Sequence, residues 1–521
     1  MRIRVGLIGD SLCWSQLLRQ EGVPFATASV SNLDTSSWSA IVVARPVAKA
    51  EADGIKNYLR DGGSLLAFAG HVGEACGLEC VKGRIDYLVS DGDDPFNDVR
   101  LLDLGMDGIV PREANILRTD AGVRAMLVGP LQGGHAVILP FDPAAATTDW
   151  RSANKSFFFT RERLPSERVS MVSKGEIRYL IHRSLEYLHH ARGLPFVHLW
   201  YYPGGKQSLF AFRVDTDSAP KDEIDDLYHI SSDHRVPFTW YLDVKSHEDW
   251  LSHFGTFASQ EIGVHCYVHK TFDGYEQNLK NITDAVRAMN ETGLKPRGFS
   301  APYGIWNPEL ARAVDDLGFL YTSEFSYLYD SLPIYPMTGE CCWKALQVPI
   351  HPICIGSMLR VGYKEKQMMD YFEQVVAWKV SRGEPLFFYH HPLHRCWAVV
   401  EGLLGLMNKM EIASTTLGDY ARWWKNRETC VLKAEFGGDV IGIDLERGDV
   451  GTYHDLWIEV TTPDGRSQRL PVDGGKVDLR KNEGWETIQR APAPADIRRI
   501  REFDPRAALG QLYTLLQRKL R

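Results

Sequence analysis

Two aspartates, Asp215 and Asp217, follow the apolar run SLFAF (208–212) within the segment FRVDTD. Residues two apart on a strand lie on the same face, so the two carboxylates would stand close together. Two like charges held close repel, which raises the pKa of one of them unless something positive lies between them. The pair therefore indicates either a bound cation or simple surface polarity just beyond the end of a strand.

A second pair of chemically active residues, His265 and His269, lies in the segment EIGVHCYVH (261–269). A spacing of four brings two imidazoles to one face of a helix or a tight turn. Two histidines and one carboxylate with open coordination positions form a catalytic site for Zn²⁺, Fe²⁺ or Co²⁺. The chain has 17 histidines, and an isolated pair at this spacing is also typical of a surface or core feature.

Five motifs in the same order resemble those of the polysaccharide deacetylase family, the NodB-homology family or carbohydrate esterase family 4. The resemblance covers roughly residues 205–428. The motifs are FRVDTD (212–217), EIGVHCYVH (261–269), GFSAPYG (298–304), EPLFFYHHPLHR (384–395) and STTLGDYARWW (414–424). This resemblance implies a metal-dependent enzyme that hydrolyses a linear amide C–N bond.

The resemblance also implies the metal ligands. Asp217, His265 and His269 occupy the positions that bind a divalent cation in the family. We expect zinc, with cobalt, nickel and iron as alternatives.

Three further residues receive catalytic roles from the resemblance. Asp215 is the expected general base, and the backbone N–H of Tyr303 is expected to hold the oxyanion together with the metal. His391 is the expected general acid, with His390 as the alternative, because His391 directly precedes a proline as the family motif requires.

One position departs from the family pattern. The family has an arginine just before its Pro-Tyr turn, and here that position is Ser300. Arg213 lies two residues before Asp215 and therefore on the same strand face. We hypothesise that Arg213 replaces the missing arginine and keeps Asp215 ionised, and a purely structural ion pair in the barrel is the alternative.

Other polar and aromatic residues have weaker patterns. His351 precedes a proline but comes before the final helix and strand, and His394 and Arg395 either line the cleft or belong to a loop. Four aromatic residues either stack on a sugar ring or pack in the core: Trp240, Tyr241, Trp306 and Tyr327.

Residues 205–428 contain seven apolar runs with helical patterns between most of them. We expect a distorted (β/α) barrel with roughly seven strands, whose chemistry lies at the carboxyl ends of the strands. In one predicted helix, Asn307 is the candidate N-cap and Pro308 occupies the first turn. The runs are SLFAF, PFTWYL, IGVHCY, GFSAPY, FLYTSEF, LQVPI and LFFYHH.

The flanking regions predict three further units. Residues 1–165 alternate continuous apolar runs with helical patterns, which indicates a flavodoxin-like α/β domain. This region resembles class I glutamine amidotransferases but lacks their nucleophile, since His71 follows the strand and Cys76 comes too late. Residues 166–204 read as a linking helix and junction, and residues 429–521 as a small antiparallel β-sandwich with a C-terminal helix.

Composition limits the partners. The net charge of −8 argues against a nucleic-acid partner, and no apolar run approaches the ~20 residues that span a bilayer. The nine cysteines are scattered and form no CxxC pair, which is typical of reduced thiols. With no signal-peptide pattern at the start of the chain, we expect a cytoplasmic protein. The oligomeric state and the ligands of the flanking domains stay open.

The sequence thus predicts an N-deacetylase or N-deformylase acting on an amino sugar. A nucleotide-linked or lipid-linked sugar in cell-surface polysaccharide biosynthesis fits the predicted compartment. Two alternatives stay open: the same hydrolysis on a non-sugar amide, and a catalytically inactive carbohydrate-binding or scaffolding protein.

Overall fold

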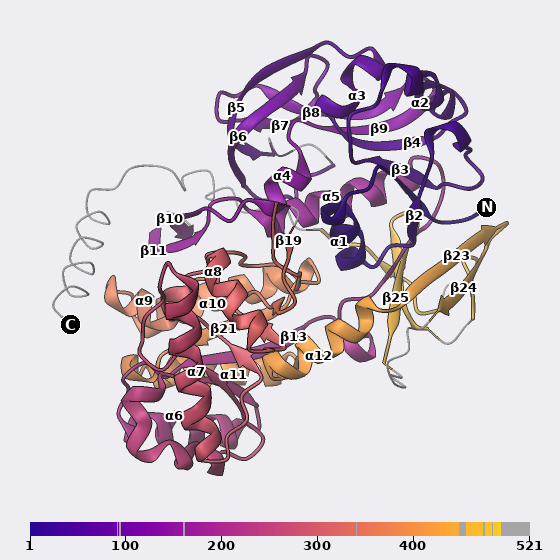
Figure 1. Ribbon diagram of the computed structural model, residues 1–521. Coiled ribbons are helices and arrows are strands. Elements are labelled where there is room, and N and C mark those ends of the chain that lie inside the picture. The colour runs from indigo at the N-terminus through magenta and orange to yellow at the C-terminus, as the bar shows by residue number, and fades with distance from the viewer. Residues whose placement is uncertain are drawn as a thin grey trace.

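The computed structural model forms three neighbouring regions, with the N-terminal region and the C-terminal sheets beside a central barrel (Figure 1). It describes residues 1–90, 92, 95–159, 162–339, 341–446, 455–472, 475–481 and 483–490. The predicted C-terminal helix AALGQLYTLLQRKLR lies outside the described residues.

The N-terminal region is built on a nine-stranded sheet of order β2-β1-β3-β4-β9-β8-β7-β5-β6. Its parallel part comprises β1 (Val5–Ile8), β2 (Phe25–Thr27), β3 (Ala40–Val43), β4 (Ser64–Phe68) and β9 (Gly134–Leu139). The order of these five strands is that of flavodoxin-like sheets, as predicted. The helices are α1 (Leu12–Glu21), α2 (Ala52–Arg60), α3 (Ala69–Cys76) and α5 (Lys174–His190).

Four antiparallel strands extend this sheet and were not predicted. They are β5 (Cys80–Val89), β6 (Leu102–Pro111), β7 (Ile116–Thr119) and β8 (Arg124–Leu131). After α4 (Pro143–Thr148), a hairpin of β10 (Ser152–Phe159) and β11 (Glu162–Ser170) leads into α5. Leu164 of this hairpin is buried in the hydrophobic core of the barrel. The resemblance of this region to glutamine amidotransferases stays a prediction.

The central region contains the seven predicted parallel strands, in the order β20-β17-β16-β15-β14-β13-β21. They are β13 (Leu209–Asp215), β14 (Phe238–Leu242), β15 (Glu261–Val264), β16 (Gly298–Phe299), β17 (Tyr321–Thr322), β20 (Leu346–Gln347) and β21 (Leu386–His390). β22 (Ala413–Ser414) also pairs with the start of β13. The strands β20 and β21 stand at the two ends of the order, and just beyond β20 the His351 N–H donates to Phe387 O at 2.8 Å.

Helices surround this curled sheet (Figure 1). They are α6 (Lys221–His234), α7 (Tyr275–Glu291), α8 (Pro308–Asp316), α9 (Ile355–Arg360), α10 (Glu365–Ser381), α11 (Trp397–Lys409) and α12 (Leu417–Glu428). Asn307 caps α8 as predicted, since its side chain accepts a hydrogen bond from Leu310 N–H at 2.7 Å.

The last region consists of two antiparallel sheets that share one hydrophobic core. One contains β23 (Val431–Gly437), β24 (Val440–Glu446) and β27 (Lys476–Asp478). The other contains β25 (Trp457–Thr461), β26 (Arg466–Pro471), β28 (Glu486–Thr487) and β12 (Phe196–Leu199). The antiparallel character was predicted, but β12 comes from the stretch that we had read only as a junction.

Candidate metal and catalytic site

The first part of the site lies where β13 ends. Asp215 is the last residue of the strand, and Asp217 follows in the left-handed backbone region with φ of 44°. Thr216 between them fastens the turn to β14, because its N–H donates to Tyr241 O at 3.0 Å. A fixed turn at the end of the strand therefore holds the two carboxylates in place.

The two histidines come from the loop after β15. His265 is buried, and its Nδ1–H donates to Ser300 O at 2.7 Å, which leaves Nε2 free of the ring proton. The chain then turns at Cys266, with φ of 71°, and brings His269 back beside His265. The predicted proximity is present, but it arises from this turn.

The three predicted ligand atoms converge. Asp217 Oδ1 lies 3.0 Å from His269 Nε2 and 3.5 Å from His265 Nε2, and the two nitrogens are 3.1 Å apart. Ligands about 2.0–2.1 Å from a tetrahedral zinc ion lie about 3.3 Å from one another. Asp217 Oδ1 is also buried without a well-aligned hydrogen-bond donor among the described residues. The three side chains fit a divalent cation (Asp217, His265 and His269).

Arg213 pairs with Asp215 through two hydrogen bonds. Its Nε and Nη2 each donate to one carboxylate oxygen at 2.6 Å, and both side chains are buried. Nη1 donates to Ser323 O at 2.5 Å, which anchors the guanidinium. Burial alone would raise the pKa of Asp215, but Arg213 together with His265 and His391 outweighs this effect and holds the pKa below its usual value. Asp215 is therefore ionised at neutral pH.

The structure brings His391 to the two carboxylates. Its Nε2 lies 3.8 Å from Asp217 Oδ2 and 3.9 Å from Asp215 Oδ2. Burial alone would lower the pKa of His391, but Asp217, Cys354 and Asp215 together raise it to about 9. His390 instead donates from Nε2 to Arg395 O at 2.8 Å, and burial lowers its pKa to about 3. Of the two neighbours, His391 has the position and the charge of a general acid.

Tyr303 lies on the 3₁₀ turn Pro302–Gly304, with φ of 59°. Its ring packs edge-on against the His269 imidazole, with 5.0 Å between centroids. Glu324, which we did not predict, holds this turn by accepting a hydrogen bond from Ala301 N–H at 3.0 Å. Burial raises the pKa of Glu324 to about 7. Left-handed backbone at Tyr303, Asp217 and Cys266 places three strained residues around one site.

Asp243, directly after β14, is a further acidic residue that sequence reasoning missed. Its N–H donates to Thr216 Oγ1 at 3.1 Å, and it accepts from Ser246 Oγ at 2.6 Å. The carboxylate is buried close enough to His265 and His269 to be affected by their charge, and burial raises its pKa. Its position at a strand end was a usable signal.

Several other candidates lie outside this cluster. His351 is buried between Asp330 and Tyr371, and Arg395 pairs with Glu223. The four aromatic candidates are at most 4% exposed and belong to the core: Trp240, Tyr241, Trp306 and Tyr327.

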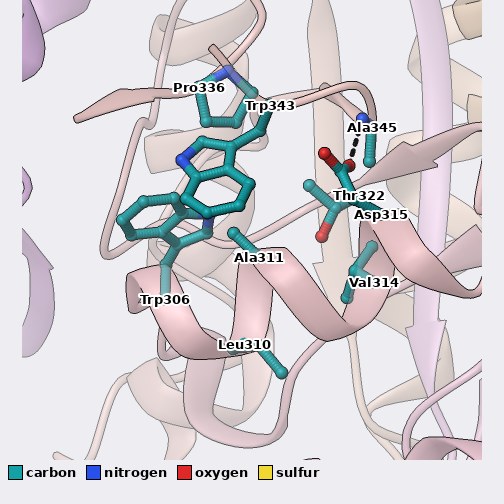
Figure 2. A pocket seen from close by; sticks show the side chains of 9 residues that line it. All are labelled: Trp306, Leu310, Ala311, Val314, Asp315, Thr322, Pro336, Trp343 and Ala345. Atoms are coloured by element: carbon teal, nitrogen blue, oxygen red, sulfur yellow. Dashed lines mark hydrogen bonds between the residues drawn. The ribbon is translucent and has the colours of Figure 1, made fainter. Parts of the chain in front are cut away.

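Trp306 also lines a small cavity with Trp343, between α8 and the segment around β19 (Cys341–Cys342) (Figure 2). Its volume is about 10 Å³, room for about one water molecule and too little for a sugar ring.

Residues 214–322 match the polysaccharide deacetylase family, so the barrel contains a polysaccharide deacetylase domain. This stretch includes both aspartates and both histidines of the candidate metal site, and the match supports a hydrolase of the deacetylase type. No curated protein matches the chain. Within the described residues, no helix is both long and apolar enough to cross a membrane.

Solved structures similar to this chain include proteins described as polysaccharide deacetylases from Mycobacterium smegmatis and Pseudomonas aeruginosa PAO1. The first is 16% identical with a TM-score of 0.38, covering 43% of this chain and 92% of its own. The second is 17% identical with a TM-score of 0.37, covering 43% and 93%. A carbohydrate esterase family 4 pseudoenzyme from Bacillus anthracis is 12% identical with a TM-score of 0.30, covering 42% and 66%.

Proposed function

We propose that this chain is a metal-dependent amide hydrolase that removes an acetyl or formyl group from an amino sugar. One observation carries the proposal: Asp217, His265 and His269 converge at metal-ligand distances, with Asp215 and His391 beside them. A paired base and acid next to a cation site are the components that amide hydrolysis requires.

The roles follow from charge and position. A divalent cation held by Asp217, His265 and His269 would supply Lewis acidity, which lowers the pKa of water and polarises a carbonyl. Asp215, ionised beside Arg213, accepts the proton of the attacking water. The Tyr303 N–H donates to the oxyanion, and His391 donates its Nε2 proton to the departing amine.

The proposal assigns Arg213 the task of keeping Asp215 ionised, in place of the arginine that the family has at Ser300. Arg213→Met should lower turnover at least about a hundredfold while metal content stays unchanged, because the base loses its counter-charge. Arg213→Lys keeps the positive charge but cannot form the bidentate hydrogen bonds to Asp215, and it should retain part of the activity. Full activity of Arg213→Met would refute this role.

Metal content is the first measurement. Protein purified without chelators or a histidine tag should contain close to one equivalent of zinc, cobalt, nickel or iron by mass spectrometry. The double variant Asp217→Ala/His269→Ala should contain none. The native protein should then release acetate or formate from acylated amino sugars, offered free, as oligomers, nucleotide-linked and lipid-linked.

Two other results would redirect the assignment. Release from simple acyl amides but from none of the sugars would indicate the same chemistry on a non-sugar substrate. A native protein that binds no metal after zinc or cobalt addition, and that hydrolyses nothing, would indicate a carbohydrate-binding or scaffolding role.

A further inference from the structure

Cys354 is a buried residue next to the proposed general acid that the mechanism above does not use. It directly precedes α9 and caps that helix with its sulfur, which accepts a hydrogen bond from Ser357 N–H at 3.2 Å. The Ser357 hydroxyl donates in turn to Cys354 O at 2.9 Å. The sulfur is therefore fixed in position and already serves as an acceptor.

The chain before Cys354 runs against β21, which ends directly before His391. Just ahead of it, His351 N–H donates to Phe387 O at 2.8 Å, and Tyr389 Oη donates to Pro352 O at 3.1 Å. These two bonds connect the segment that contains the thiol to the strand that directly precedes the proposed acid.

The His391 ring has two different sides. Nε2 faces the carboxylates of Asp215 and Asp217 at 3.9 and 3.8 Å, so Nδ1 lies on the opposite side. Nδ1 is buried and has no well-aligned hydrogen-bond partner among the described residues. The Cys354 thiol lies near enough to this imidazole for each group to shift the pKa of the other, although no regular hydrogen bond joins them.

The other neighbours of the ring are unsuited to orient it. Tyr389 packs edge-on at 5.6 Å and uses its hydroxyl on Pro352 O. His394 packs edge-on with 5.4 Å between ring centroids and lies against Gly356.

The Cys354 sulfur is a weak hydrogen-bond acceptor, and it already accepts from Ser357 N–H at 3.2 Å. Burial alone would raise the pKa of the Cys354 thiol, but His391 together with Arg360 holds it below its ordinary value.

We infer that Cys354 is the positioning residue for His391: its sulfur accepts a hydrogen bond from Nδ1–H, so that Nε2 carries the transferable proton. In each turnover the Nε2 proton passes to the departing amine, the Nδ1 proton stays in place, and Nε2 is reprotonated from solvent. This inference rests on the proposed function, since it assigns a partner to the proposed acid. Histidines that act in catalysis or bind metals are commonly oriented through their second nitrogen in this way.

The test compares two substrates that differ in their need for an acid. An N-acetylated amino sugar has a poor leaving group, which must be protonated, whereas an aryl acetate has a good one. Cys354→Ala should lower kcat on the amide about 10–100-fold with KM within about twofold. The rate on the aryl acetate should fall no more than about threefold. Cys354→Asp should restore most of the amide rate, because a carboxylate accepts the same proton.

Two controls separate this inference from the proposed function. His391→Ala should lower the amide rate further than Cys354→Ala does, and metal content should be unchanged in all variants. Equal losses on both substrates, or none on the amide, would overturn the role of Cys354.

A measurement independent of turnover uses ¹⁵N-histidine NMR, with His391 assigned by its absence from His391→Ala. Unchanged Nδ1 and Nε2 shifts of His391 in Cys354→Ala would overturn the inference even if the native protein hydrolyses neither substrate. A changed Nδ1 shift without any turnover would instead support the contact and refute the proposed function.

Discussion

Two buried polar clusters of the molecule differ in how their charges are balanced. The first is the candidate site around Asp217. The second, the interdomain ion network, joins the N-terminal region to the barrel through three cations and three carboxylates, with distances of 2.7–4.0 Å. The network consists of Arg100, Glu176, Asp330, Lys379, Arg382 and Glu384.

The two clusters differ in what their closest contacts join. In the network, close contacts join opposite charges, as between Lys379 Nζ and Asp330 Oδ1 at 2.7 Å. In the site, only Asp215 has such a partner among the described residues, Arg213 at 2.6 Å. The His265 and His269 Nε2 atoms lie 3.1 Å apart and face a carboxylate oxygen, although such atoms are acceptors in their metal-binding forms. The proposed cation would balance these facing acceptors, whereas the network balances its own charges.

The largest effect expected from breaking the site is on activity. Asp217→Asn should lower turnover by at least about a thousandfold, because it removes a ligand and the chemistry that the ion supplies. It should also abolish the zinc-dependent stabilisation, about 2.7 kcal/mol for the native protein at a hundredfold excess over Kd. Calorimetric melting with and without zinc measures this. A native-like zinc response in Asp217→Asn would refute the ligand assignment.

Breaking the network should affect stability instead. Asp330→Asn leaves the buried Lys379 ammonium with only Glu384 at 3.6 Å and should lower the unfolding free energy by about 3–5 kcal/mol. Zinc binding per folded molecule should be unchanged, because no ligand is involved. Urea unfolding followed by tryptophan fluorescence, with metal analysis of the folded protein, tests this pattern. Loss of metal from Asp330→Asn would contradict the separation of the two clusters.

Glu324 is an intermediate case: a buried acid that forms no ion pair with the described residues and has a pKa raised by burial to about 7. Both states are protonated below about pH 4.5, and between pH 4.5 and 7 only the unfolded chain loses its proton. The contribution of Glu324 to stability is therefore present at low pH and is lost as pH rises to 7.

Glu324→Gln lacks this titration and keeps the acceptor for Ala301 N–H. We expect equal stability of the two proteins near pH 4.5 and an advantage of up to roughly 3 kcal/mol for the variant at pH 8. Unfolding both proteins in parallel cancels the titration of other groups. A difference that does not vary with pH would contradict the raised pKa.

Local patterns in the sequence predicted the barrel strands, and the family resemblance implied which three residues would lie together as metal ligands. Arg213 was predicted to face Asp215 from the two-residue period of a strand, and the structure has this pair. Each of these predictions depends on residues within one short motif, or on strand ends that a parallel barrel gathers at one edge.

What the sequence did not reveal depends on contacts between distant segments. β12 joins β25 across more than 250 residues, and β5–β8 turn antiparallel beside the predicted parallel strands. Cys354 and Glu324 reach the site through a helix cap and a loop, and neither belongs to a motif. Periodicity reports which face of an element is buried, and it carries no information on which distant element covers that face.

The smallest expected effect tests whether the ion pairs of the network stabilise the fold more than a surface ion pair does because they are buried. Helix α10 carries Lys379 in the network and also Lys366, which pairs with Asp370 at 3.0 Å on the surface. The side chain of Lys366 is 86% exposed and that of Lys379 is 1% exposed. Lys366→Gln should change the unfolding free energy by no more than about 0.5 kcal/mol, because water screens the pair and competes for both partners.

Lys379→Gln, on the same helix, should lower it by about 3–5 kcal/mol, because Asp330 would keep a buried charge with one partner fewer. Both substitutions remove a lysine charge from one helix, so helix propensity and net charge change alike. If the two variants lose similar amounts of unfolding free energy, burial of Lys379 is not what makes its charge stabilising. The proposal that the network stabilises the fold, whereas the candidate site binds a cation, would then lack its evidence from stability.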